Sequence, residues 1–310
     1  MRLVFLGTPE FAVPTLRRIV EAGHDAAAVI TQPDRPRGRG QHPAASPVKQ
    51  FALEHGLDVY QPERVRRPEA VERLRQLAPE AMVVVGYGQI IPQSVIDIAP
   101  LGIINVHASL LPKYRGAAPI QWAIVNGETR TGVTTMRIDA GLDTGDILLQ
   151  SETEIGPEEN AIDLSQRLST MGAELLVETL KNLRAITPRK QDASQATHAR
   201  LLTKEDGLIE WSEAVQAIHN RVRGLQPWPG AYTTFRGQRL HIWKSRVASR
   251  DADGPVPGAM FCTRPLLVAC GGGALEVVEV QLEGRKRMPA DAFANGHRLN
   301  DNEMLGELSV

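Results

Sequence analysis

The chain has 310 residues, of which 42% are hydrophobic and 23% charged, and its net charge is −1. This is the composition of a globular protein, so it excludes a disordered, collagen-like or low-complexity chain, and at roughly 150 residues per domain the length favours two domains. Short apolar runs, the lack of a secretory signal pattern and only two cysteines (Cys262 and Cys270) exclude a membrane-spanning chain, a disulfide scaffold and a cysteine-rich zinc site, so we expect a soluble cytoplasmic protein.

The first part of the chain alternates strand and helix patterns. Strands are predicted at residues 2–6, 26–30, 82–85, 102–107 and 133–138, and helices at residues 10–22, 46–55, 69–77 and 158–183. Apolar strands separated by helices are typical of a mostly parallel α/β sheet that is buried on both faces. Residues 31–43 are so rich in proline and glycine that no regular element is expected there.

The pattern changes in the last third of the chain. Residues 187–203 are polar and poor in large apolar side chains, which is typical of a linker. A helix pattern at residues 212–222 is followed by strand patterns at residues 231–235, 238–244, 259–262, 266–269 and 274–280. Short strands with glycine turns predict a small antiparallel barrel or sandwich. We therefore expect one domain over residues 1–188, a linker over 189–204 and a second domain over 205–310.

A basic stretch interleaved with aromatic residues lies in the second domain. Residues 214–250 contain no acidic side chain and carry Arg221, Arg223, Arg236, Arg239, Lys244, Arg246 and Arg250, with Trp228, Tyr232, Phe235 and Trp243 among them. Because cations neutralise phosphates and aromatic rings stack on bases, this stretch is compatible with nucleic-acid binding. A solvated sheet face whose aromatic residues point into a core would give the same pattern.

Two polar side chains end one of the predicted strands. Asn105 and His107 are two residues apart, so the alternation of a strand places them on the same face. Binding sites form at the carboxyl edge of parallel sheets, which is where this strand ends. A histidine held by a backbone carbonyl for structural reasons is the alternative for His107, and the neighbouring Asn105 makes it less favoured.

A second polar cluster follows the strand pattern at residues 133–138. It holds Asp139, Asp143 and Asp146 together with glycines that allow tight turns. A calcium loop is one alternative, but the spacing lacks the required pattern and its distal glutamate. An acid presented at a strand end beside the Asn105 and His107 pair could orient the imidazole or carry a proton.

Several motifs taken together resemble the folate-dependent formyltransferases. Residues 105–121 read Asn-Val-His-Ala-Ser-Leu-Leu-Pro-Lys-Tyr-Arg-Gly-Ala-Ala-Pro-Ile-Gln, and residues 141–146 read Gly-Leu-Asp-Thr-Gly-Asp. Residues 5–11, the arginine-rich loop 31–40 and the Gln-Pro-Trp-Pro-Gly-Ala-Tyr segment at 226–232 are similar to the branch of this family that acts on methionyl-tRNA. The resemblance extends over nearly the whole chain.

This resemblance implies a Rossmann-like catalytic domain followed by an OB-like barrel domain that binds tRNA. The implied reaction transfers the formyl group of 10-formyltetrahydrofolate to the amino group of methionine on initiator tRNA, in a monomer and without a metal. It implies that the catalytic residues are Asn105, His107 and Asp143.

The same resemblance assigns binding roles to further residues. It implies that the folate is contacted by a turn made of Ser109, Leu110, Leu111 and Pro112, with residues 86–91 as the neighbouring wall of the pocket. Arg39 matches the loop arginine that engages the tRNA acceptor stem in this family.

The chemistry of these residues agrees with that reaction. An amine attacks a formyl carbon directly, so the site must stabilise the developing oxyanion and move a proton. Asn105 and His107 are suited to donate to the oxygen, and Asp143 is suited to orient His107 and help carry the proton. Two alternatives stay open: a formyltransferase acting on a small amine, which has no use for the arginine loop, and a folate- or RNA-binding module without turnover.

Overall fold

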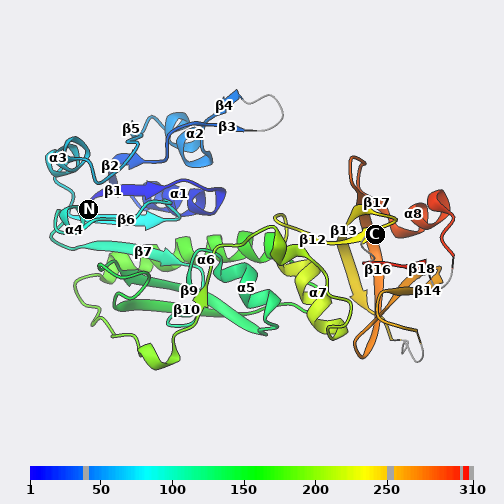
Figure 1. Ribbon diagram of the computed structural model, residues 1–310. Helices are drawn as coiled ribbons and strands as arrows, with labels where there is room; N and C mark the ends of the chain where they lie inside the picture. Colours follow the sequence, from blue (N-terminus) through cyan, green and yellow to red (C-terminus); the bar gives the residue numbers. More distant parts are fainter. Residues whose placement is uncertain (38–41, 250–254, 301–302, 307–310) are drawn as a thin grey trace. The chain divides into compact units, whose positions relative to one another are not determined.

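The computed structural model of the protein describes residues 1–37, 42–249, 255–300 and 303–306 (Figure 1). The chain divides into two compact units. The first unit comprises Met1–Gly116, Thr131–Thr153 and Ser165–His198, and the second comprises Ala117–Arg130, Glu154–Leu164 and Ala199–Val310. Among the described residues, no helix is long and apolar enough to cross a bilayer.

The first unit is built on a seven-stranded sheet in the order β10-β9-β7-β6-β1-β2-β5. Its strands are β1 (Arg2–Gly7), β2 (Asp25–Ile30), β5 (Val59–Tyr60), β6 (Ala81–Val85), β7 (Ile103–His107), β9 (Arg130–Arg137) and β10 (Ile147–Glu154). Strands β1, β2, β5, β6 and β7 run parallel, and β9 runs antiparallel to β7. The predicted mostly parallel, Rossmann-like sheet is therefore confirmed.

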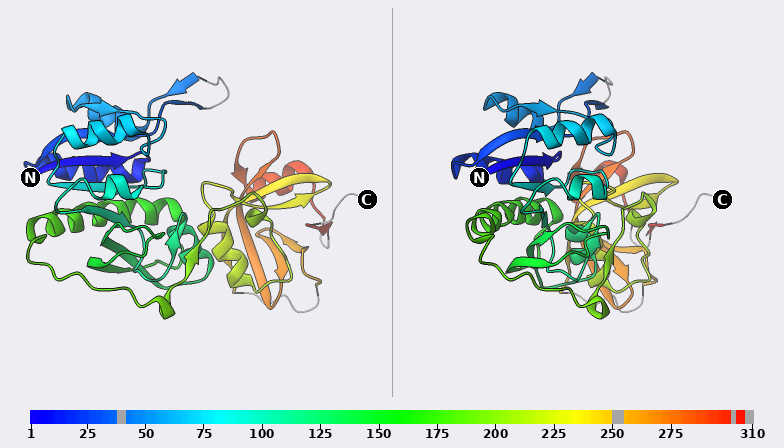
Figure 2. Two further views of the ribbon diagram at one scale, coloured as in Figure 1. Left: turned by 60° about the vertical axis from the view of Figure 1, so that its left-hand side comes forward. Right: turned by 90° about the vertical axis from the view of Figure 1, so that its left-hand side faces the viewer.

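Helices cover both faces of this sheet. They are α1 (Val13–Glu21, preceded by a 3₁₀ turn at Glu10–Ala12), α2 (Pro47–Glu54), α3 (Pro68–Gln76), α4 (Gln93–Ile96) and α6 (Ala161–Asn182). One core packs α1, α2 and α6 against the sheet, and the other packs α3 and α4 against its opposite face. In the left view of Figure 2, the long helix α6, drawn in green, runs lengthwise beside the sheet. Pro47 and Pro68 stand in the first turns of α2 and α3, where a missing N–H is tolerated.

Strand β7 shows the predicted alternation. Ile104 and Val106 belong to the core beneath α6, whereas Ile103 belongs to the core beneath α3. Because side chains alternate along a strand, Asn105 and His107 project from the same face as Ile103. They do so at the carboxyl end of β7, where the strands β1, β2 and β6 also end.

The expectation that residues 31–43 contain no regular element is wrong. Strand β3 (Arg35–Arg37) pairs antiparallel with β4 (His42–Ala44), with Pro36 opposite Pro43. An antiparallel ribbon alternates hydrogen-bonded pairs with pairs that need no N–H, so two prolines facing each other fit its second kind of position. Proline content alone therefore did not exclude pairing.

Residues 187–203 contain no long helix or strand, in keeping with their polar sequence. They hold a 3₁₀ turn at Ala193–Gln195 and β11 (His198–Ala199), which pairs with β8 (Arg115–Gly116). Arg189 also forms a backbone bridge with Ile147. This segment is thus tied to its surroundings at several points.

The second unit holds a curled antiparallel sheet, the OB-like barrel that was expected. Its strands follow the order β12-β13-β16-β15-β14-β18, with β17 paired to β16. They are β12 (Ala231–Phe235), β13 (Gln238–Val247), β14 (Ala259–Thr263), β15 (Leu266–Cys270), β16 (Gly273–Leu282), β17 (Met288–Pro289) and β18 (Glu303–Met304). Its helices are α5 (Pro119–Val125), α7 (Val215–Gly224) and α8 (Ala290–His297), with a 3₁₀ turn at Glu205–Gly207. Helix α8 was not predicted, because its apolar stripe has few members.

A buried histidine joins α7 to the barrel in this unit. His219 is 4% exposed, and its Nδ1 lies 3.1 Å from the Ser245 hydroxyl while Nε2 lies 3.4 Å from the Pro157 carbonyl oxygen. Burial lowers the pKa of His219, and the nearby Arg223 lowers it further, although Glu158 opposes the shift. The folded state therefore binds a proton at this imidazole less tightly than the unfolded chain does.

This histidine makes the free energy of unfolding depend on pH. Because the pKa of His219 is lower in the folded state, the unfolded chain binds its proton first, and stability falls as the pH drops below about 6.5. The loss attributable to one proton is at most about 1.4 kcal/mol per pH unit. Urea unfolding of wild type and His219→Gln at pH 7.5 and 5 checks this: the stability advantage of wild type over the variant should shrink at pH 5. An unchanged difference would contradict it.

Candidate active site

His107 is held at one ring nitrogen by the backbone. Its side chain is 7% exposed, and Nε2 lies 2.9 Å from the carbonyl oxygen of Tyr114. A carbonyl only accepts hydrogen bonds, so Nε2 must carry the proton and donate it. The neutral imidazole therefore has its lone pair on Nδ1, which is the nitrogen available for chemistry.

Asp143 faces that second nitrogen. Its Oδ2 lies 3.7 Å from His107 Nδ1 and accepts a 2.9 Å hydrogen bond from the N–H of Gly116. The Asp143 side chain is 16% exposed. The structure thus brings His107 and Asp143 together, as expected, but the carbonyl of Tyr114 rather than the carboxylate sets the tautomer of the imidazole.

The route of the chain to Asp143 differs from the expected one. We predicted that the acid follows a strand ending beside His107. Strand β9 runs antiparallel to β7 and ends at Arg137, opposite Ile104, at the far end of β7. The loop after β9 must therefore turn back along the sheet to bring Asp143 to the imidazole.

Asn105 lies two residues before His107 on the same face of β7. It is half-buried, and its backbone pairs with Val84 of β6 and Met136 of β9. Its side-chain amide makes no hydrogen bond within the part of the chain that the structure describes. A half-buried amide with spare donors beside an imidazole is suited to bind a developing negative charge.

The turn predicted to contact folate is organised by one buried hydroxyl. Thr134 is 0% exposed, and its Oγ1 donates to the Ser109 carbonyl (2.7 Å) while accepting from the Leu111 N–H (3.2 Å). The Gln150 amide donates to the same hydroxyl (3.0 Å) and to the Leu111 carbonyl (2.9 Å). Ser109 and Leu111 are buried, whereas Leu110 and Pro112 are half-buried.

The residues predicted as a neighbouring wall, 86–91, follow β6. Gly86 and Gly88 have positive φ angles of 56° and 83°. The carbonyl of Tyr87 accepts hydrogen bonds from Thr8 and Gln32, both at 3.1 Å, which ties this turn to the ends of β1 and β2. Ile90 is 92% exposed. The turn therefore lies at the same carboxyl edge as Asn105 and His107.

The acids of the Asp139–Asp146 loop take separate partners. Asp139 accepts hydrogen bonds from the Gly141 N–H and the Thr144 hydroxyl, whereas Asp143 faces His107 and Gly116. No group of three or more His, Cys, Asp or Glu side chains among the described residues is arranged to hold a metal ion. The carboxylates of Asp139 and Asp143 thus bond to different partners.

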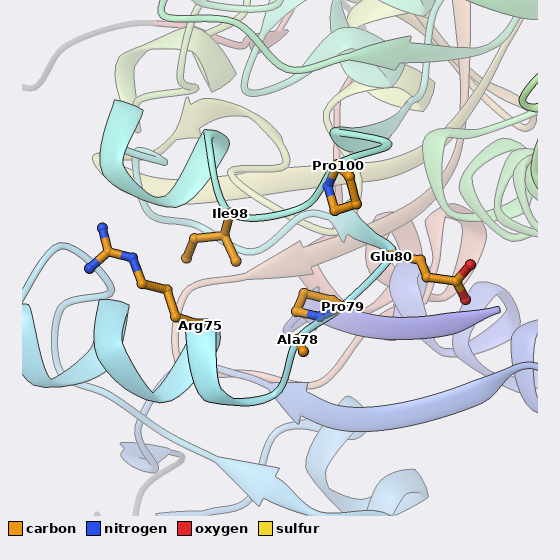
Figure 3. A pocket seen from close by; sticks show the side chains of 6 residues that line it. All are labelled: Arg75, Ala78, Pro79, Glu80, Ile98 and Pro100. Atoms are coloured by element: carbon orange, nitrogen blue, oxygen red, sulfur yellow. The ribbon is translucent and has the colours of Figure 1, made fainter.

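A pocket of about 340 Å³ lies elsewhere in the first unit (Figure 3). It is lined by Arg75, Ala78, Pro79, Glu80, Ile98 and Pro100. Arg75, Ala78, Pro79 and Glu80 precede β6, and Ile98 and Pro100 precede β7. The pocket therefore lies at the amino edge of the parallel strands. None of the predicted site residues lines it.

The structure describes some of the residues predicted to contact tRNA and not others. Arg39 lies outside the described residues, as does Arg250 of the basic stretch. Arg223 is 7% exposed and donates to the carbonyls of Gly156 and Glu159, and Arg221 bonds Glu213 and the Asp206 carbonyl. The structure therefore gives Arg221 and Arg223 a role other than the phosphate contact with which their sequence is compatible: they stabilise the fold.

Other members of that stretch form a half-buried aromatic ladder, made of Tyr232, His241 and Trp243. The His241 and Trp243 rings stack with centroids 5.4 Å apart, and Tyr232 lies 5.7 Å from His241. Arg239 lies over Tyr232 at 4.7 Å and Arg287 over Trp243 at 3.6 Å. Burial and these two arginines lower the pKa of His241. Sequence reasoning missed Arg287, because it lies outside the basic stretch and reaches the ladder only through the pairing of β16 with β17.

Comparisons with known proteins match both parts of the chain. Residues 1–180 match the family described as "Formyl transferase", and residues 201–298 match "Formyl transferase, C-terminal domain". An N-formyltransferase from Helicobacter canadensis, solved with folinic acid and dTDP-3-aminofucose, has a TM-score of 0.69 at 20% identity, over 89% of this chain and 99% of that one. At this identity the likeness concerns the fold.

Two relatives of higher identity are methionyl-tRNA formyltransferases. The chain is 73% identical over 309 residues to the methionyl-tRNA formyltransferase of Solibacter usitatus, with 99% of each chain covered. It is 55% identical over 314 residues to the methionyl-tRNA formyltransferase of Koribacter versatilis, with 100% of each covered. The chain therefore belongs to the formyl transferase family, and within it to the methionyl-tRNA formyltransferases.

The Thr134 hydroxyl should be required for the stability of the 109–112 turn. Thr134→Val keeps the shape but leaves the Leu111 N–H without its acceptor, removes one of two hydrogen bonds of the Gln150 amide and leaves the Ser109 carbonyl without its donor, so the free energy of unfolding should fall by about 1–3 kcal/mol. Denaturant unfolding measures this. Thr170→Val, at an exposed position of α6, is the control and should stay within about 0.5 kcal/mol of wild type. Equal effects of the two substitutions would contradict the role of Thr134.

Proposed function

We propose that this chain transfers the formyl group of 10-formyltetrahydrofolate to the α-amino group of methionine esterified to initiator tRNA. The observation that carries the proposal is the arrangement of Asn105, His107 and Asp143, in a chain 73% identical to a methionyl-tRNA formyltransferase over almost its full length. Asn105 and His107 share one face of β7, and the imidazole presents Nδ1 to a carboxylate.

Asn105 is proposed to bind the formyl oxygen. The attack of the amine turns the carbonyl into a tetrahedral centre, and negative charge gathers on its oxygen. The N–H groups of the Asn105 amide are available as donors. Because they are already in place, little reorganisation is needed when the charge develops. His107 adds a second donor at Nδ1 whenever that atom is protonated.

The His107 and Asp143 pair is proposed to move the proton. The new bond joins the methionine nitrogen to the formyl carbon, and the bond from that carbon to the folate nitrogen breaks. The proton lost by the attacking amine must reach the departing folate nitrogen. Nδ1 is the only ring nitrogen free to take it up and release it, because Nε2 already donates to Tyr114. The Asp143 carboxylate, 3.7 Å away, stabilises the protonated ring in between.

The remaining parts of the proposal concern binding. We assign the folate to the turn of residues 109–112 and the wall of residues 86–91, both at the carboxyl edge of the sheet, and the acceptor stem to the loop that contains Arg39. The catalytic domain is taken to span residues 1–188 and the tRNA-binding domain residues 205–310, with 189–204 between them. We further propose that the enzyme acts as a monomer in the cytoplasm.

The aromatic ladder supports a tRNA-binding role for the second unit. Rings capped by guanidinium groups offer stacking surfaces for bases and cations for phosphates. Arg239 and Arg287 are exposed above Tyr232 and Trp243, and Arg285 and Lys286 are exposed beside Arg287. We propose that this face contacts the RNA backbone or an unpaired base.

One assay tests the function against its alternatives. The protein is incubated with 10-formyltetrahydrofolate and methionyl-initiator tRNA, and formylmethionine is measured after hydrolysis of the ester. Formylation of an amino-sugar nucleotide, such as the dTDP-3-aminofucose bound in the Helicobacter canadensis structure, but not of the tRNA would favour the small-amine enzyme. Binding of both substrates without product would favour a module without turnover.

Asn105→Ala and His107→Ala should each abolish most turnover. Loss of one oxyanion donor typically costs about 3 kcal/mol, so kcat should fall by at least about 100-fold. Binding of methionyl-tRNA should stay within a factor of about 3, because neither side chain is assigned to the RNA. Single-turnover kinetics with a filter-binding measurement separates the two quantities. Loss of tRNA binding at an unchanged rate in the bound complex would refute the assignment.

Removing the two arginines of the ladder should weaken tRNA binding without slowing the bound complex. In Arg239→Ala/Arg287→Ala, the slope of log K against log salt should become shallower by about 1.4 to 1.8, since each lost phosphate contact contributes about 0.7 to 0.9. The control is Lys181→Ala/Arg184→Ala, which removes the same charge from the C-terminal end of α6. Equal slopes in the two variants would exclude the ladder from RNA binding.

A further inference from the structure

The segment between residues 187 and 198 reaches back into the candidate active site. Its Gln191 uses one amide nitrogen for two hydrogen bonds, to the carbonyl oxygens of Asp143 (2.9 Å) and Gly145 (2.7 Å). Its Oε1 accepts two more from Arg115, at 3.0 Å from Nε and 2.8 Å from Nη2. All four hydrogen-bonding positions of the Gln191 amide are therefore used.

These bonds also fix the orientation of the Gln191 amide. Carbonyl oxygens only accept, and a guanidinium only donates, so the nitrogen must face Asp143 and Gly145 while the oxygen faces Arg115. Arg115 itself is 7% exposed, so its charge is committed to this contact rather than to solvent. The arrangement forms a rigid link between Arg115 and the loop that carries Asp143.

The Asp143 loop needs such a link. Asp143 has a φ of 53°, in the left-handed region that residues other than glycine adopt infrequently. Residues 139–142 are exposed, so few packing contacts hold the loop. The Gly116 N–H holds the carboxylate, and Gln191 holds the backbone carbonyl of the same residue.

The same segment supports the other side of the imidazole. Thr197 accepts a hydrogen bond from the Tyr114 N–H at its hydroxyl and from the Arg115 N–H at its carbonyl, both at 2.9 Å. Tyr114 is also in the left-handed region, with a φ of 60°, and its carbonyl accepts the hydrogen bond from His107 Nε2. Two strained residues thus flank His107, and the 187–198 segment bonds to both.

We infer that Gln191 is a positioning residue for the formyl transfer: by holding the backbone of Asp143 against Arg115, it places the carboxylate opposite His107 Nδ1. This inference rests on the proposed function, because it assigns Gln191 a role through Asp143. Gln191 does not touch the imidazole, and it is not a catalytic residue. The 187–198 segment, whose sequence is typical of a linker, thus contributes a positioning residue to the site.

Steady-state kinetics of formyl transfer to methionyl-initiator tRNA tests the inference. Gln191→Ala should lower kcat by about 10- to 100-fold, the effect expected when a reacting group is misplaced by about 1 Å, while KM for the tRNA changes less than about threefold. Gln195→Ala is the matched control: Gln195 lies in the same segment, is exposed, and its side-chain amide donates to Asp192. It should keep the kcat of wild type.

A double-mutant cycle separates positioning from a general structural effect. If Gln191 acts through Asp143, then in the Asp143→Ala background the change of Gln191 to Ala should alter kcat by less than about twofold. Multiplication of the two losses would overturn the inference, as would a loss confined to KM for the tRNA or an unchanged kcat in Gln191→Ala.

A second variant distinguishes the loss of the contact with the Asp143 loop from misfolding of Gln191→Ala. Gln191→Glu has no donor for the carbonyls of Asp143 and Gly145, but its carboxylate forms a charged pair with Arg115 that offsets this loss, so the variant should unfold at a temperature close to that of wild type and still lose kcat. Wild-type kcat in Gln191→Glu would overturn the inference. Absence of formyl transfer by the wild-type chain would instead contradict the proposed function.

Discussion

The hydrogen bond from His107 Nε2 to the Tyr114 carbonyl determines how the rest of the site is used. Because a carbonyl cannot donate, this contact commits one nitrogen of the ring to the backbone and leaves the other to face the acid. Strand β7 supplies the imidazole, Tyr114, whose φ is positive, supplies the carbonyl, and the loop after β9 supplies the carboxylate of Asp143. A change in the position of Tyr114 would alter which nitrogen is available.

Much of the architecture could be read from the sequence. The parallel sheet, its helices and the barrel strands follow from apolar periodicity, which depends only on local residues. The shared face of Asn105 and His107 follows from the alternation of a single strand. The motif suggested that Asp143 lies near Asn105 and His107. The path of the chain to Asp143 could not be predicted, because the antiparallel direction of β9 depends on strand pairing and not on the local sequence pattern.

The supporting residues were beyond the reach of sequence reasoning for a different reason. The Tyr114 carbonyl and the Gly116 N–H are backbone groups, so any residue type could provide them. Gln191 lies in a polar segment without periodicity, and its partners are 46 to 76 positions away in the chain. Charge counts were misleading as well: Arg221 and Arg223 look like surface cations in the sequence but bond to groups of their own unit.

The anchors in the 187–198 segment also constrain its length. Arg189 bridges Ile147, Gln191 reaches the Asp143 loop and Thr197 holds Tyr114, so each anchor must arrive at a fixed distance along the chain. Residues 192–195 lie between two anchors, are exposed and bond mainly to one another. Extra residues inserted there would bulge into solvent, whereas a deletion would pull one anchor off its partner. For anyone fusing a reporter into this enzyme, that short stretch is the place to open the chain.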